Sequence, residues 1–91
     1  MRIVWKYALA MADTQLVNLP NGAEILSVQD QRGTLTIWAM VDPDEKRISP
    51  MTIEIIPTGV PVQPAKRKHL ATVQQQDGHL LWHVFEREAA S

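Results

Sequence analysis

Three histidines are the side chains best suited to hold a metal ion or to move a proton: His69, His79 and His83. His79 and His83 stand four residues apart in a segment whose Trp82 and Phe85 favour a strand. In a strand their Cα atoms lie roughly 13 Å apart, because each residue advances the chain by about 3.3 Å. The two imidazoles therefore cannot share one ion, and the chain has no cysteine to supply thiolate ligands. We predict no metal site and no cofactor.

The other residue types that perform catalysis are not arranged as an active site. Ser27 and Ser49 lack the glycine elbow of a nucleophilic serine. The sequence contains no phosphate loop of the GxxxxGK type, no GxGxxG turn and no pair of acidic residues on a shared face. We predict that the protein is not an enzyme and that it acts by binding.

His83 stands out because it lies in an otherwise apolar stretch, LLWHVF (80–85). If this stretch is a strand, its two faces carry Leu80, Trp82 and Val84 on one side and Leu81, His83 and Phe85 on the other. Both faces are then covered, and the imidazole needs a hydrogen-bond partner across the contact. Two interpretations remain open: a satisfied histidine at a packing or dimer interface, or a ligand or proton-sensing contact.

Aromatic and basic residues supply the remaining candidates for a binding surface. Trp38 lies on the threonine side of its predicted strand, where it could face a partner subunit or stack on a planar ligand. For each aromatic residue a place in the core is the alternative, and for the basic run 66–68 a solvated loop tip is the alternative. The candidate ligand-binding or interface residues are Trp5, Tyr7, Trp38, Thr58, Gly59, Lys66, Arg67, Lys68, His69, Trp82 and His83.

Turn sequences at short, regular intervals indicate a β protein. Leu19-Pro20-Asn21-Gly22, Asp30-Gln31-Arg32-Gly33 and Gln75-Gln76-Asp77-Gly78 each predict a hairpin with a type I turn and a glycine bulge. The segments between turns are rich in Val, Ile, Thr, Leu and Trp. They predict strands near residues 2–9, 14–19, 23–30, 34–42, 48–56, 69–75 and 79–86. We expect a mainly β fold with little helix: a small, single-domain antiparallel β-sandwich or barrel of about seven short strands.

Alternation within two strands predicts which face is buried. In 34–42 the residues Leu35, Ile37, Ala39 and Val41 point to one side, which we assign to the core. In 48–56, Pro50 cannot donate a ladder hydrogen bond, so this strand is expected to be an edge or to bend there. Residues 8–16 could form a helical turn instead of a strand, although they lack an amino-terminal cap.

The stretch IPTGVPVQPAKRKHL (56–70) lacks a strand pattern. It contains Pro57, Pro61 and Pro64, and Thr58-Gly59 lies between the first two prolines. Ordering a connection of this length costs conformational entropy, and contacts with the rest of the domain must offset that cost. We leave two interpretations open: a functional loop or packing arm, and a solvated crossover with a basic tip.

Length and charge limit the classes of protein. A chain of 91 residues and 10.3 kDa without cysteine forms one domain, 1–91, and needs packing or self-association for stability. We therefore expect a homo-oligomer, a dimer or higher. Nine basic against ten acidic residues give a formal charge of −1, which disfavours duplex nucleic acid as a partner. No apolar run reaches membrane-spanning length, so we expect a cytosolic protein that does not bind a membrane.

Six stretches along nearly the whole chain carry a family resemblance: IVWKYAL, LPNGAEILSVQ, LTIWAMVDPD, PTG, LATVQ and LLWHVFE. In this order they resemble a family of short, uncharacterised proteins from tailed bacteriophages and prophages. Ala71 stands in the fifth stretch where the family pattern has glycine. The resemblance implies a phage-encoded protein in the cytoplasm of the host bacterium, and it carries no catalytic residues to transfer.

Small phage proteins without enzymatic motifs commonly act by binding. We therefore expect a non-enzymatic counter-defence protein, which either blocks a host immune complex or sequesters a signalling nucleotide; its partner is then a host defence protein or a small nucleotide. The first alternative is a structural or interaction accessory protein of the phage, a virion component or a replication cofactor. The second is a barrel of the OB type that binds single-stranded nucleic acid.

Overall fold

The computed structural model describes residues 1–88, and within them the chain forms seven antiparallel strands and no helix. They are β1 (Ile3–Ala8), β2 (Thr14–Pro20), β3 (Glu24–Gln31), β4 (Thr34–Val41), β5 (Ile48–Pro57), β6 (Arg67–Gln75) and β7 (Leu80–Arg87). A three-stranded sheet has the order β1-β4-β3, and a four-stranded sheet has the order β2-β5-β7-β6. The prediction of a mainly β protein is confirmed, and the helical alternative for 8–16 is wrong.

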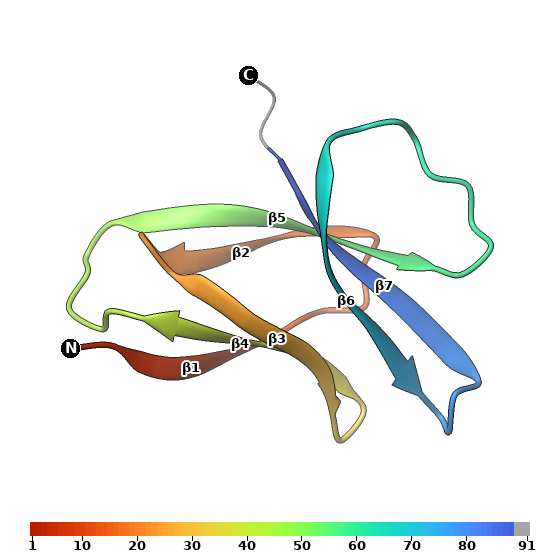
Figure 1. Cartoon of the computed structure of the whole chain (residues 1–91), viewed down its shortest axis with the longest axis horizontal. Helices are drawn as coiled ribbons and strands as arrows, with labels where there is room; N and C mark the ends of the chain where they lie inside the picture. The colour runs from red at the N-terminus through yellow and green to blue at the C-terminus, as the bar shows by residue number, and fades with distance from the viewer. Residues whose placement is uncertain (89–91) are drawn as a thin grey trace.

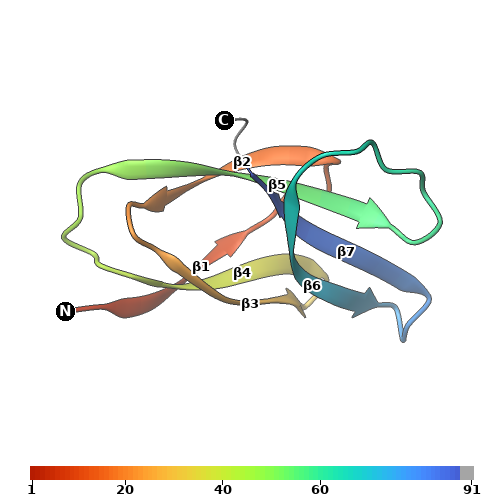
Figure 2. The same cartoon turned by 45° about the horizontal axis from the view of Figure 1, so that its top comes forward.

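The two sheets lie face to face as a sandwich (Figures 1 and 2). The chain passes from one sheet to the other between β1 and β2, between β2 and β3, and between β4 and β5. At one side β3 packs against β6 without backbone pairing; at the other side lie the edge strands β1 and β2. Because the sheets are separate, the sandwich is the correct one of the two predicted architectures, and a closed barrel is not formed.

The core lies between the sheets and follows the predicted alternation of β4. Leu35, Ile37, Ala39 and Val41 are completely buried, and Ile53, Ile55 and Val84 of the four-stranded sheet face them in the same cluster. Each large aliphatic side chain that is fully buried in this way contributes about 1.5–3 kcal/mol through the hydrophobic effect. Trp38 lies on the opposite, outer face of β4, as expected from its place among threonines.

The expectation that β5 is an edge strand because of Pro50 is wrong, since β5 lies between β2 and β7. Ile55 donates its backbone N–H to the carbonyl of Asp13, so the odd-numbered residues of β5 bond to β2. The nitrogen of Pro50 therefore points away from β2, toward the β7 side. Within residues 1–88, pairing with β7 begins at Thr52, so Pro50 lies outside the described part of this pairing and its missing donor breaks none of these bonds.

The turns differ from the predicted type I turns with a glycine bulge. Arg32 and Gly33 join β3 to β4 as a two-residue turn, and both have positive φ, 52° and 91°. Positive φ at both central residues is the pattern of a type I′ hairpin turn. The Pro20–Ala23 turn has positive φ at Gly22 alone, and it links strands of different sheets instead of forming a hairpin.

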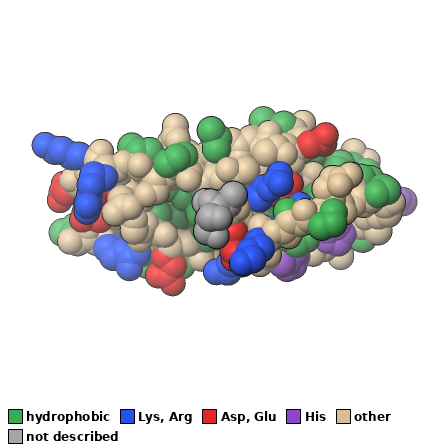
Figure 3. All heavy atoms as spheres, turned by 90° about the horizontal axis from the view of Figure 1, so that it is seen from above, with side chains coloured by type: hydrophobic (Ala, Val, Ile, Leu, Met, Phe, Trp, Pro, Cys, Tyr) green, Lys and Arg blue, Asp and Glu red, His purple; other side chains and the backbone are tan. Residues whose placement is uncertain are grey.

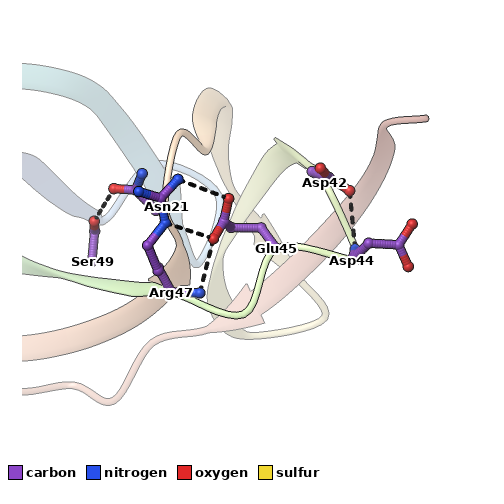
Figure 4. Close-up of polar contacts among 6 residues, drawn as sticks. All are labelled: Asn21, Asp42, Asp44, Glu45, Arg47 and Ser49. Carbon is purple, nitrogen blue, oxygen red and sulfur yellow. Dashed lines mark hydrogen bonds and ion pairs between the residues drawn. The ribbon is translucent and has the colours of Figure 1, made fainter.

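The connection between β4 and β5 is held by short-range polar contacts (Figure 4). Asp42 accepts a hydrogen bond from the backbone of Asp44. Glu45 accepts hydrogen bonds from the backbone and side chain of Arg47, which lower the pKa of that carboxyl. Ser49, at the start of β5, donates to Asn21 at 2.7 Å and so ties this end of the strand to the β2–β3 turn.

Candidate functional site

The outer face of the four-stranded sheet carries a carboxylate between two arginines. Strand pairing places Arg67 of β6 directly opposite Arg87 of β7, an unfavourable pair of like charges. Glu54 of β5 relieves it: its Oε1 lies 2.8 Å from Nε of Arg67 and its Oε2 lies 3.9 Å from Nη1 of Arg87. The Glu54 and Arg67 side chains are only 11% and 14% exposed, whereas the Arg87 side chain is 48% exposed. Arg87 therefore remains available to an anion from solution.

The loop 58–66 forms the wall of a pocket beside this charge cluster. Arg67 fixes the loop by donating from Nη1 to the carbonyl of Gln63 at 3.0 Å. The pocket has a volume of about 350 Å³, within the range of small-ligand sites. Its apolar lining includes Ile56, Val60 and Val62, and its charged lining includes the three members of the cluster. We call this cavity the loop pocket; the loop bordering it is the connection from β5 to β6 that extends beyond the sheets in Figure 1.

Four hydroxyl and imidazole groups form a hydrogen-bonded chain next to the loop pocket, from His69 through Thr72 and His83 to Thr58. Nε2 of His69 lies 3.0 Å from Oγ1 of Thr72, which lies 3.0 Å from Nδ1 of His83. Nε2 of His83 lies 2.8 Å from Oγ1 of Thr58, the first residue of the loop. Figure 3 shows the histidines gathered toward one end of the molecule. His83 is thus satisfied by threonines of its own chain.

The single proton of the Thr72 hydroxyl couples the two imidazoles. When Thr72 donates to His69, it must accept from Nδ1–H of His83, and Thr58 then donates to the free Nε2 of His83. In the opposite arrangement His69 donates to Thr72, Thr72 donates to His83, and His83 donates to Thr58. Because the hydroxyl has one proton, the two imidazoles cannot both accept from Thr72, so the tautomers of His69 and His83 are coupled.

Replacing Thr72 with valine should separate the tautomers of His69 and His83 and lower the free energy of unfolding by about 1 kcal/mol, because a hydroxyl with two partners is lost. The measurement is long-range ¹H–¹⁵N NMR of the imidazoles, with urea unfolding for stability. Thr72→Ser is the matched control and should preserve the wild-type tautomers. Unchanged tautomers in Thr72→Val would show that the hydrogen-bonded chain does not set them.

The structure brings together some of the predicted site residues and separates others. Arg67, His69 and His83 lie on the outer face of the four-stranded sheet, Thr58 of the loop contacts His83 there, and the exposed Gly59 and Lys66 also lie in the loop. Trp82 faces the core, where its Nε1 donates to Gln75. Trp5 and Tyr7 lie on the inner face of β1, and Trp38 lies on the outer face of the three-stranded sheet. No single aromatic site is formed.

The basic run does not lie at a loop tip. Arg67 and Lys68 are the first residues of β6, and they pair with Arg87 and Glu86 of β7. Successive residues point to opposite faces, so Lys68 lies on the side away from Arg67 and lines a groove between β6 and β3. Only one cation of the run, Arg67, therefore contributes to the loop pocket.

Four important residues of the outer face were missed by sequence reasoning: Glu54, Thr72, Arg87 and Val60. Glu54 had a local signal, because it is a charged residue between Ile53 and Ile55 in a strand. Val60 lies in the 56–70 stretch that sequence analysis left open as a functional loop, whereas Thr72 and Arg87 had no signal, since their roles depend on which strands are neighbours. The members of the charge cluster, residues 54, 67 and 87, are far apart in sequence, so their contact cannot be predicted from a local pattern.

Tyr7 is the one side chain whose polar atom is buried without a hydrogen-bond partner in the part of the chain that the structure describes. Burial raises the pKa of its phenol above the usual value. Tyr7 lies on β1 in the other sheet and does not line the loop pocket.

A family model described as a domain of unknown function (DUF7352) matches residues 1–91. No curated protein and no solved structure matches the chain. The resemblance to a family of uncharacterised proteins is thus supported, while the phage origin stays a prediction. Within residues 1–88 there is no group of three or more potential metal ligands and no helix suited to cross a membrane.

Proposed function

The chain belongs over its whole length to the family described as a domain of unknown function (DUF7352), and from its own surface we propose that it is a non-enzymatic binding protein that sequesters a signalling nucleotide. The loop pocket is the proposed binding site. We further propose that the protein is encoded by a phage and acts in the host bacterial cytoplasm, where removal of the nucleotide counters a defence system.

One observation carries this proposal: an apolar wall and an available cation meet in one pocket. Val60 and Val62 are large hydrophobic side chains left about half exposed at the loop, which is the surface a flat nucleobase can cover. Arg87 lines the same pocket with a half-exposed side chain, and its guanidinium suits a phosphate. Glu54 can accept a further hydrogen bond from a base, since its carboxylate oxygens contact only two arginines in the part of the chain that the structure describes.

The size of the pocket determines how much of a nucleotide it holds. A volume of about 350 Å³ lies near the lower end of small-ligand pockets. We therefore expect one base with its adjacent phosphate to enter, while the rest of a larger nucleotide remains in solvent. This favours a small signalling nucleotide over a long single strand, and the separate sheets do not provide the barrel of an OB fold.

Isothermal titration calorimetry with a panel of cyclic and linear dinucleotides tests the proposal. At least one of them should bind, and Arg87→Glu should weaken binding about tenfold or more, as expected when a charge-assisted hydrogen bond is replaced by repulsion. Arg32→Glu is the matched control, because Arg32 is an exposed arginine in the distant β3–β4 turn. Absence of heat with every nucleotide, or equal weakening by both variants, would contradict the proposal.

A second candidate function, the blocking of a host immune complex, is favoured by the outer face of the three-stranded sheet. Trp38 and Met40 are partly exposed there, next to Val4, which is 49% exposed. Aromatic residues and methionine are enriched at protein interfaces. Protection of a phage in an infection assay would then fall with Trp38→Ala and persist with Arg87→Glu. A structural accessory role has no comparable feature in its favour.

A further inference from the structure

The four edge strands of the sandwich are not equally protected against pairing with another chain. β3 and β6 each contain a bulge, at Leu26 and Leu70, and they pack against each other. β2 ends on Pro20, whose nitrogen points to the free edge because odd-numbered residues of β2 bond to β5. β1 is a regular strand without proline or bulge. An unprotected edge of this kind is a template for another strand.

The backbone of β1 offers its free hydrogen-bonding groups at known positions. Leu9 donates to the carbonyl of Leu35, which lies directly opposite it in the register of β1 and β4. The odd-numbered residues of β1 therefore bond to β4, and Val4, Lys6 and Ala8 direct their N–H and C=O groups toward the free edge. A partner strand must bond to these even-numbered residues.

Lys6 is a residue that often prevents edge pairing, but here its charge is held away from the edge. Its Nζ donates to Oε1 of Gln31 at 3.0 Å, and Gln31 belongs to β3, on the far side of β4. The Lys6 side chain thus runs across the outer face of its own sheet, away from the free edge of β1. The neighbouring Val4 and Trp5 are 49% and 41% exposed, so the free edge carries apolar surface that a partner would cover.

We propose that two copies of this chain form a twofold dimer by antiparallel pairing of β1 with β1, with Trp5 on the axis. Three registers place even-numbered residues opposite each other near the middle of the strand. An axis at Val4 sets Arg2 opposite Lys6, and an axis at Lys6 sets two lysines opposite each other; both pair like charges on one face. The Trp5 axis sets Val4 opposite Lys6 and Arg2 opposite Ala8, and it also pairs all of residues 2–8.

The proposed register also accounts for the exposure of Trp5. The even-numbered residues make the hydrogen bonds between the two β1 strands, so the two Trp5 residues on the axis form a non-hydrogen-bonded pair. In such a pair the opposing Cα atoms lie about 4.5 Å apart and the side chains are closest. The two Trp5 rings then cover each other at the open side of both sandwiches. The dimer contains one continuous sheet of β3-β4-β1-β1-β4-β3, and its formation does not depend on the nucleotide.

Sedimentation equilibrium from micromolar to millimolar concentration tests whether the dimer forms. We expect the wild-type mass to rise to twice 10.3 kDa. Val4→Pro removes an edge-facing N–H without touching a bond to β4, so it should give a folded monomer. Leu16→Pro is the matched control, since it removes an edge-facing N–H from β2 and should still dimerise. A wild-type monomer throughout, or loss of the dimer in Leu16→Pro alone, would overturn the proposal.

Disulfide cross-linking tests the register, and the absence of native cysteine makes the readout unambiguous. A mixture of Val4→Cys chains and Lys6→Cys chains should cross-link under mild oxidation, whereas each variant alone should cross-link poorly. Cross-linking of Val4→Cys alone would move the axis to Val4, and cross-linking of Lys6→Cys alone would move it to Lys6. Either result would overturn the proposed register, as would no cross-link in the mixture.

Discussion

Replacing Glu54 with alanine should lower the free energy of unfolding by about 3 kcal/mol, because removing one partner of a buried ion pair leaves the other charge uncompensated. Arg67 keeps its place in β6 and has Arg87 directly opposite, so the repulsion between them is no longer relieved. The loop should also loosen, since Arg67 holds it at Gln63. Urea unfolding gives the change in stability, and amide hydrogen exchange at Val60, whose N–H donates to the carbonyl of Pro57, reports the loop.

Two further variants separate the buried pair from the exposed one. Glu54→Leu combined with Arg67→Met should recover most of the lost stability, because a buried pair replaced by apolar groups leaves no unpaired charge. Arg87→Ala should change stability by less than about 1 kcal/mol, since its side chain is half exposed and its contact with Glu54 is 3.9 Å long. If Glu54→Ala unfolds at the same urea concentration as the wild type, the charge cluster does not stabilise the fold.

Replacing Ile37 with alanine should lower the free energy of unfolding by about 3–4 kcal/mol, as expected for truncation of a completely buried side chain. Ile37 is completely buried at the centre of β4, between the paired residues Tyr7 and Val28. Its removal leaves a cavity that the two sheets cannot close without shifting. The measurement is equilibrium urea unfolding with an unchanged slope, so that the midpoint alone reports the difference.

The neighbouring residue provides the control for this prediction. Trp38 is larger than Ile37 but lies on the outer face and is partly exposed. Trp38→Ala should therefore destabilise less than Ile37→Ala, even though it removes more atoms. The reverse order would mean that the buried face of β4 is assigned wrongly and that Trp38 belongs to the core.

Local patterns were sufficient to predict the strands and their faces. The alternation of β4 predicted that Leu35 and Ile37 are buried and that Trp38 is not, because side chains in a strand alternate strictly. Turn residues divided the chain into seven segments, and each contains a strand of the structure. These features depend on neighbours in sequence, which is why the amino-acid sequence alone reveals them.

Features that depend on strand neighbours could not be predicted in this way. Nothing near Pro50 indicates that β5 pairs with β7 from Thr52 onward, so an edge strand was the natural interpretation. The start of β6 at Arg67 depends on its pairing with Arg87, twenty residues later. The type I′ turn at Arg32 was missed because arginine rarely adopts positive φ, and the register of the hairpin imposes it. The charge cluster and the loop pocket follow from the same distant pairing.

The binding of a nucleotide in the loop pocket is tested most directly by an NMR titration. The dinucleotide that gives the largest heat in calorimetry is added to chains labelled on valine methyls and on arginine and tryptophan side-chain nitrogens. We expect shifts at Val60, Val62 and Arg87, with the indole signals of Trp5 and Trp38 unchanged. Shifts concentrated at Trp38, or no shift at Val60 and Val62 when the nucleotide is saturating, would contradict the assignment of this pocket.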